Sequence, residues 1–75
     1  MEGKLTEQAL HRNIKTLRKS LGISQVELAR LIGIKQSGVS KIERGIQRPG
    51  IDRLPILADV LGVTVDELFR EQPTN

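Results

Sequence analysis

The 75-residue sequence predicts an all-α fold, a compact bundle of five short helices. Apolar side chains recur at separations of three and four residues, which is the period of a helix with one buried face. Glycines follow four of these periodic segments, and a helix commonly ends at a glycine with left-handed backbone. Because cysteine is absent, neither disulfides nor thiolate zinc sites are expected to hold the core. The four glycines are Gly22, Gly33, Gly45 and Gly62.

The first helix is predicted over residues 6–21, and Gly22 closes it. Basic residues separate its apolar positions, so one face is expected to be buried and the other to carry positive charge. The apolar positions are Leu10, Ile14, Leu17 and Leu21.

Ser24 and Glu27 form an S-x-x-E capping box, which predicts the start of a second helix at Gln25. In such a box Ser24 accepts a hydrogen bond from the backbone of Glu27, and Glu27 reaches back to the backbone of Ser24. Gly33 is expected to end this helix. Ala29 is small, so another helix can approach closely there.

A third helix is predicted over about residues 36–44, with Val39 and Ile42 on its buried face. Its start is irregular because Lys35 occupies the N-cap and offers no acceptor to the free N–H groups. Gly38, inside the helix, costs about 1 kcal/mol relative to alanine. It indicates either a close backbone approach or tolerance in a helix held by its neighbours, and we favour tolerance.

Residues 46–51 form the longest predicted loop, and a fourth helix follows over residues 53–61. Asp52 is its expected N-cap. That choice puts Pro55 at the third helical position, where an N–H group has no partner within the helix. Gly62 is expected to end the helix.

Thr64 and Glu67 form a second capping box, which predicts a fifth helix over residues 65–70. The chain from Glu71 onward is expected to fray. The sequence therefore predicts one domain with a helical core over about residues 10–70.

Positive charge is concentrated in the first two thirds of the chain. The formal net charge is +3 and the isoelectric point is near 9.8. Residues 1–50 carry ten Lys or Arg against four Asp or Glu, whereas residues 51–75 carry two against five. A basic surface neutralises phosphates and contributes sequence-independent affinity for nucleic acid. The basic half is also the half that contains the second and third helices.

Several classes of function are disfavoured by composition. His11 is the only histidine, so we expect no metal site, and we expect no cofactor. No apolar run approaches the roughly 18 residues of a membrane span, and the N-terminus lacks a leader pattern. Helix capping already accounts for the carboxylates of Glu27, Asp66 and Glu67, so an enzyme is not expected. We expect a cytoplasmic, nucleoid-associated protein without a membrane partner.

The stretch from Gln25 to Arg44 fits two short helices joined by a turn at Gly33, the shape of a helix-turn-helix. The segments LGISQVELARLIGIKQSGVSKIERG and LADVLGVTVDELF match a family pattern in order and spacing. Over about residues 10–70 the chain resembles the Cro/repressor-type (XRE-like) helix-turn-helix transcriptional regulators, which include phage repressors and restriction-modification controller proteins. The resemblance implies a lambda-repressor-like fold.

The resemblance also implies a DNA-binding role for named residues. In the family the third helix enters the major groove of double-stranded DNA, and Gln25 both touches the DNA backbone and supports Gln36. Lys35 departs from the family pattern; its side chain either extends into water or lies near a DNA phosphate that offsets its charge. The base-reading positions implied are Gln36, Ser37, Ser40 and Lys41. The backbone-contacting or orienting positions implied are Ser24, Gln25, Lys35, Arg44 and Arg48.

Two further sets of residues concern assembly. Arg18 and Glu43 match a structural ion pair of some family members, which is either partly buried or exposed here. A homodimer on a palindromic operator is expected, because one small reader contacts few base pairs. Candidate dimer contacts, with core packing as the alternative, are Leu61, Val63, Val65 and Phe69.

The leading hypothesis is therefore a non-catalytic, sequence-specific transcriptional regulator that binds DNA as a dimer. The alternative is an antitoxin-like protein-interaction module that binds DNA secondarily. RNA polymerase and a toxin protein are the protein partners that these hypotheses suggest. The short segment beyond Phe69 leaves little chain for wrapping a partner, which disfavours the alternative.

Overall fold

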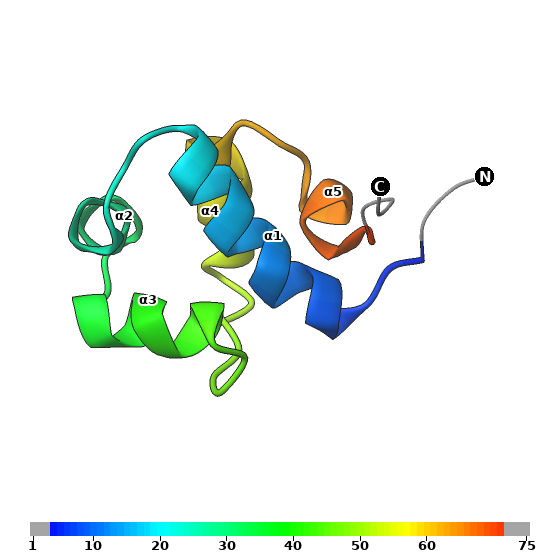
Figure 1. Ribbon diagram of the computed structural model, residues 1–75, viewed down its shortest axis with the longest axis horizontal. Coiled ribbons are helices and arrows are strands. Elements are labelled where there is room, and N and C mark those ends of the chain that lie inside the picture. Colours follow the sequence, from blue (N-terminus) through cyan, green and yellow to red (C-terminus); the bar gives the residue numbers. More distant parts are fainter. Residues whose placement is uncertain (1–3, 72–75) are drawn as a thin grey trace.

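Five helices follow one another along residues 4–71, the part of the chain that the computed structural model describes. Figure 1 shows α1 crossing the centre of the molecule, with α2 and α3 on one side and α5 on the other. This arrangement confirms the predicted all-α fold. The helices are α1 (Glu7–Ser20), α2 (Gln25–Ile32), α3 (Gln36–Glu43), α4 (Leu54–Leu61) and α5 (Val65–Phe69).

One hydrophobic core joins the five helices. The central helix α1 packs against α3, α4 and α5, and α2 packs against α3 and α4. Each helix contributes apolar side chains at the predicted three- and four-residue spacing. The helices are too short to be stable alone, so this burial holds them. The prediction was wrong for Leu21, which is 52% exposed because α1 ends at Ser20 and leaves Leu21 as its C-cap. The largest fully buried side chains are Leu10, Ile14, Leu28, Val39, Leu57 and Leu68.

The predicted caps formed at α2 and α5, with one exception. The Oγ atom of Ser24 accepts a hydrogen bond from the Glu27 backbone at 3.0 Å. At α5 both halves of the box are present, with Thr64 and Glu67 bonded reciprocally at 3.1 and 2.8 Å. The predicted return bond from Glu27 to the Ser24 backbone was wrong. The Glu27 carboxylate instead accepts from Arg30 at 2.6 Å, because a charged donor lies one turn along the same helix.

The helix boundaries differ from prediction by at most one residue at each end, and the predicted N-cap of α4 was wrong. The N-cap is Arg53, and Asp52 lies in a preceding turn. In that turn the Arg53 backbone N–H donates to the Gly50 carbonyl at 2.8 Å, which delays the start of the helix. Pro55 therefore occupies the second helical position, where its missing N–H still costs nothing.

The segment before α1 and the segment after α5 lie side by side and form a pairing that the sequence did not predict. Leu5 and Arg70 form an antiparallel β-bridge. The Glu71 backbone N–H donates to the Lys4 carbonyl at 2.8 Å, so the prediction that the chain frays from Glu71 was wrong at that residue. The rest of that prediction, for residues 72–75, lies outside the described residues.

Asn13 is a buried polar side chain that fastens α5 to α1. Its exposed fraction is 3%. The side-chain amide nitrogen lies 2.8 Å from the carbonyl oxygens of Leu68 and Arg70 and 3.3 Å from that of Glu67. These carbonyls belong to the C-terminal end of α5, where no further helical turn supplies donors. A side chain from α1 therefore caps a helix 54 residues or more away in sequence.

Asn13→Ala is expected to lower the free energy of unfolding by about 1–3 kcal/mol, because buried carbonyl oxygens would be left without their donor. Urea unfolding followed by circular dichroism measures the change. Thr16→Ala, at an exposed position on the same helix, serves as the control and should stay within about 0.5 kcal/mol of the parent. Equal stability of the two variants would contradict the capping role.

Candidate nucleic-acid interface

The turn between α2 and α3 fixes the angle of the helix pair. Gly33 has a φ of +79°, in the left-handed region that a residue with a Cβ enters at a cost. Its backbone N–H and that of Ile34 both donate to the Ala29 carbonyl, at 2.9 and 3.0 Å. At Gly38 a Cβ would lie 3.2 Å from the Ile34 Cδ1 atom. The nearest atoms all belong to the Ile34 side chain and not to backbone, so the close backbone approach considered for Gly38 is not what this position shows.

The outer side of α3 carries the candidate base-reading residues. Val39 and Ile42 face the core, and each is at most 2% exposed. In Figure 1, α3 lies along the lower edge of the molecule with α1 above it. Of the four predicted base-reading positions, three are exposed and Ser40 is half-buried. The three exposed positions are Gln36, Ser37 and Lys41.

Arg18 of α1 and Glu43 of α3 form a buried ion pair behind this surface. The Arg18 Nε atom donates to Glu43 Oε2 at 2.6 Å, and its Nη2 atom donates to Oε1 at 3.1 Å. The side chains are only 10% and 2% exposed. The third guanidinium nitrogen, Nη1, donates to the Ile23 carbonyl at 2.8 Å, in the connection before α2. The Arg18–Glu43 ion pair is therefore buried, which is one of the two alternatives that the sequence left open.

The surroundings of Glu43 keep it ionised. Burial raises the pKa of this carboxyl, but hydrogen bonds from Arg18 and Gln25 and the charges of Arg18 and Lys15 together outweigh burial. The pKa of Glu43 lies below its ordinary value as a result. An ionised carboxylate accepts several hydrogen bonds at once, which is what this position requires.

Two glutamines extend the ion pair to the protein surface. The Gln25 Nε2 atom donates to Glu43 Oε1 at 3.0 Å, and the Gln25 Oε1 atom accepts from Gln36 Nε2 at 2.7 Å. The amide of Gln36, at the first position of α3, is thus linked through α2 to a buried charge pair. Resemblance had suggested the contact between the two glutamines, and no spacing rule indicated that Glu43 would hold the second end of Gln25.

The candidate backbone-contacting residues surround α3 in different states. The hydroxyl of Ser24 is engaged as an N-cap, Lys35 makes no side-chain cap bond, and both are exposed. Arg44 is exposed and its Nε atom lies 3.4 Å from the Ser40 carbonyl. Arg48 pairs with Glu7 of α1 at 3.1 Å, so an anion would compete with a carboxylate for it.

Sequence reasoning missed Arg53, and for Leu61 the structure selects core packing, the alternative that the sequence left open. The Arg53 Nη2 atom donates to the Gly33 carbonyl at 3.3 Å and so ties α4 to the turn between α2 and α3. Leu61 is 3% exposed and belongs to the core, so it is not available to a second copy of the chain. The other three dimer candidates, Val63, Val65 and Phe69, are half-buried and pack against the core.

Comparison with known proteins matches this geometry. A helix-turn-helix family model matches residues 14–68, from the middle of α1 to the penultimate residue of α5. The chain belongs to the helix-turn-helix family. An uncharacterized HTH-type transcriptional regulator of Haemophilus influenzae is 40% identical over 57 residues, 76% of this chain. The chain spans 58%, 43% and 43% of the lengths of three curated relatives, this regulator being the first.

Solved structures agree with the family. The P22 c2 repressor protein in complex with a synthetic operator has a TM-score of 0.77 and 28% identity, over 80% of this chain and 91% of that one. The restriction-modification controller protein C.AhdI from Aeromonas hydrophila has a TM-score of 0.75 and 33% identity, over 81% and 92%. These likenesses confirm the predicted family and repressor-type fold. They place the chain among helix-turn-helix regulators and not among enzymes.

The described helices also bear on the membrane. Over residues 4–71, none combines the length and the apolar character needed to cross a bilayer.

Arg18→Ala is expected to lower the free energy of unfolding by about 3–5 kcal/mol, because it leaves the buried Glu43 carboxylate without its cation. Chemical denaturation measures the loss. Arg30→Ala is the matched control: the Arg30–Glu27 pair has the same 2.6 Å contact but side chains that are 68% and 41% exposed. That substitution should leave the free energy of unfolding nearly unchanged, because solvent screens an exposed ion pair.

The double variant R18M/E43L completes this test. Replacing both charges by apolar side chains removes the stranded ion, so most of the stability that R18A removes should return. A loss below about 0.5 kcal/mol in R18A, within the range of ordinary surface changes, would show that the pair contributes nothing specific.

Stability is expected to fall in acid through Glu43. Its folded pKa is depressed, so its contribution is fully present above the unfolded value of about 4.3 and is lost as pH falls through the folded pKa. Hydrogen bonds to Thr64 depress the pKa of Glu67 in the same direction, so only a comparison isolates Glu43. The free energy of unfolding, measured between pH 7 and pH 3, should depend less steeply on pH in Glu43→Gln than in the parent protein. An unchanged slope in that variant would contradict the assignment.

Proposed function

We propose that this chain is a sequence-specific transcriptional regulator that inserts α3 into the major groove of double-stranded DNA. The observation that supports this most directly is the hydrogen-bonded series from Arg18 through Glu43 and Gln25 to Gln36. It holds a base-reading amide in place before DNA arrives. Ordering a side chain in advance reduces the entropy lost on binding.

The chemistry of α3 suits the edges of bases. Glutamine pairs bidentately with adenine N6 and N7, lysine donates to guanine O6 and N7, and serine contacts either base. Gln36 and Lys41 are exposed on α3, and Ser37 lies beside them. An α-helix with its side chains is about 10–12 Å across, which is close to the width of the major groove. The four residues proposed to read bases are Gln36, Ser37, Ser40 and Lys41.

Groups around α3 would meet the phosphates. The N-terminus of α2, capped by Ser24, offers backbone N–H groups and the positive end of a helix dipole. Lys35 at the N-cap of α3 and Arg44 at its C-cap supply cations at both ends. Contacts of this kind set register and orientation without selecting sequence. Arg48 would join them by exchanging its Glu7 partner for a phosphate.

A homodimer on a palindromic operator forms part of the proposal. Two α3 helices about 34 Å apart would meet successive turns of the major groove on one side of DNA. With Leu61 assigned to the core, Val63, Val65 and Phe69 are the remaining candidates on the α4–α5 side. Contacts with RNA polymerase or a toxin protein stay predictions, and no contact within residues 4–71 favours the antitoxin-like alternative.

Selection of bound duplexes from random DNA tests the function directly. We expect a recovered site with two related half-sites about 10 base pairs apart, and a sedimenting species of two chains on it. Recovery of no preferred sequence would contradict the proposal.

Substitutions on that site then separate reading from positioning. Gln36→Ala should weaken the free energy of binding to the selected site by about 1–3 kcal/mol, because the bidentate pairing with a base is removed. The preference at one base pair should be relaxed for the same reason. Arg44→Ala should weaken specific and random DNA alike and lower the salt slope by about 1. Fluorescence anisotropy titrations at several salt concentrations measure both. If the two substitutions affected specific and random DNA identically, the assigned roles would be wrong.

A further inference from the structure

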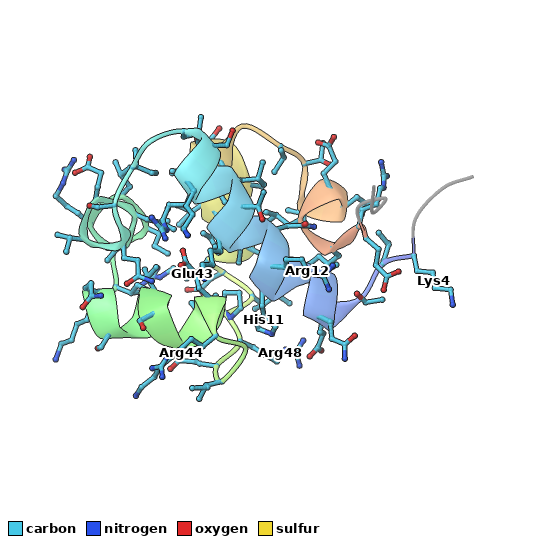
Figure 2. The ribbon with its side chains drawn as sticks, viewed as in Figure 1. Lys4, His11, Arg12, Glu43, Arg44 and Arg48 are labelled. Carbon is cyan, nitrogen blue, oxygen red and sulfur yellow. The ribbon has the colours of Figure 1, made fainter. Side chains whose placement is uncertain are left out.

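A basic pocket lies where α1 passes the end of α3, and its α1 residues are not part of the interface proposed above. Figure 2 labels His11 and Arg12 on α1 and Glu43 and Arg44 at the end of α3, on the two sides of this pocket. Lys15, one turn along α1 from His11, also lines it. Helix periodicity alone gives these α1 residues no role beyond the solvated face of a helix.

The cations of the pocket form no ion pair within the described chain. Arg12, Lys15 and Arg44 take part in none of the ion pairs among residues 4–71. The one acid in the lining, Glu43, has both carboxylate oxygens engaged by Arg18 and one also by Gln25. Three cations therefore converge on a concave site in which the carboxylate is already neutralised. Such a site attracts an anion.

His11 adds a donor that depends on protonation. Its Nδ1 atom lies 2.7 Å from the Ile42 carbonyl oxygen. Since a carbonyl only accepts, Nδ1 carries the hydrogen, and Nε2 is the remaining polar atom of the ring. A neutral ring offers a lone pair at Nε2, whereas a protonated ring donates from both nitrogens. The charged groups that line the pocket with His11 are Arg12 and Lys15 on α1 and Glu43 and Arg44 at the end of α3.

We propose that this pocket binds a backbone phosphate of the DNA, so that α1 takes part in the interface beside the helix-turn-helix. Glu43 connects the pocket to the helix-turn-helix, because its carboxylate accepts from Gln25 at the start of α2 and also lines the pocket. The pocket is therefore adjacent to the surface that α2 and α3 are proposed to present to DNA. Guanidinium and ammonium groups form short, charge-assisted hydrogen bonds with phosphate oxygens. The inference rests on the proposed function.

The variant R12Q/K15Q tests the site on the selected duplex. Its affinity should fall about tenfold at 0.1 M salt, and the salt slope should fall by about 1 for each phosphate that the protein no longer neutralises. The preference for the selected duplex over random DNA should not change, because phosphates carry no sequence information. K4Q/R70Q removes the same charge from exposed residues, and Figure 2 shows Lys4 far from the pocket. This control should retain nearly all of the affinity.

Neutral methylphosphonate linkages, placed one at a time in the duplex, identify the phosphate. At one position the neutral linkage should weaken DNA binding by the parent protein but not by R12Q/K15Q, because that variant does not contact the phosphate there.

Three outcomes would overturn the inference. Equal salt slopes for R12Q/K15Q and K4Q/R70Q would show that the pocket meets no phosphate, while the proposed function would stand. If inorganic phosphate alone shifted the His11 resonances but no methylphosphonate position distinguished the parent from R12Q/K15Q, the pocket would be a site for free phosphate. If the parent protein bound no duplex preferentially, the proposed function would fail first, and this inference with it.

Discussion

The buried contact between Arg18 and Glu43 is the constraint on which the rest of the interface depends. Hydrophobic burial is non-directional, so the core brings α1, α2 and α3 together without requiring any particular hydrogen-bond geometry between them. A two-point guanidinium–carboxylate contact is directional, and it holds α3 by one side chain at its last turn. Desolvating both charges is unfavourable unless every remaining donor is bonded. Here the third guanidinium nitrogen reaches the Ile23 carbonyl, and Gln25 adds a donor to the carboxylate.

Glu43 of this pair takes part in two further sets of contacts. Through Gln25 the contacts reach Gln36, so the exposed amide at the start of α3 is positioned by a charge buried near its end. Glu43 also lines the pocket between α1 and α3, where its carboxylate lies among cations that form no ion pair within residues 4–71. The stability of the fold and the geometry of the proposed DNA surface therefore share one group of atoms. Gly33 and Arg53 support the arrangement from the other side, at the turn.

Local sequence patterns succeeded where the competing partners were also local. Ser24 and Thr64 cap their helices as predicted, because an N-cap hydroxyl and the third N–H of a helix are adjacent in any fold. The capping patterns failed where another hydrogen-bond partner, either nearer in the sequence or in a different segment, took the place of the predicted one. Glu27 turned to a neighbouring arginine, and the loop after α3 closed a turn that displaced Asp52 from the cap of α4. Asn13 and the Leu5–Arg70 bridge join segments that no local pattern connects.

By itself the sequence determined the five helices, their buried stripes, the glycine turn and the family, since all of these depend on spacing along the chain. The tertiary structure alone decided which polar side chains are buried together. Burial of the Arg18–Glu43 pair, the second bond of Gln25, the assignment of Leu61 to the core and the basic pocket each require side chains from different helices. The spacing of residues within one helix cannot specify such meetings, because they depend on how the helices are packed. The α3 residues proposed to read bases could be predicted from the sequence, whereas the burial of the Arg18–Glu43 pair and its bond to Gln25 could not.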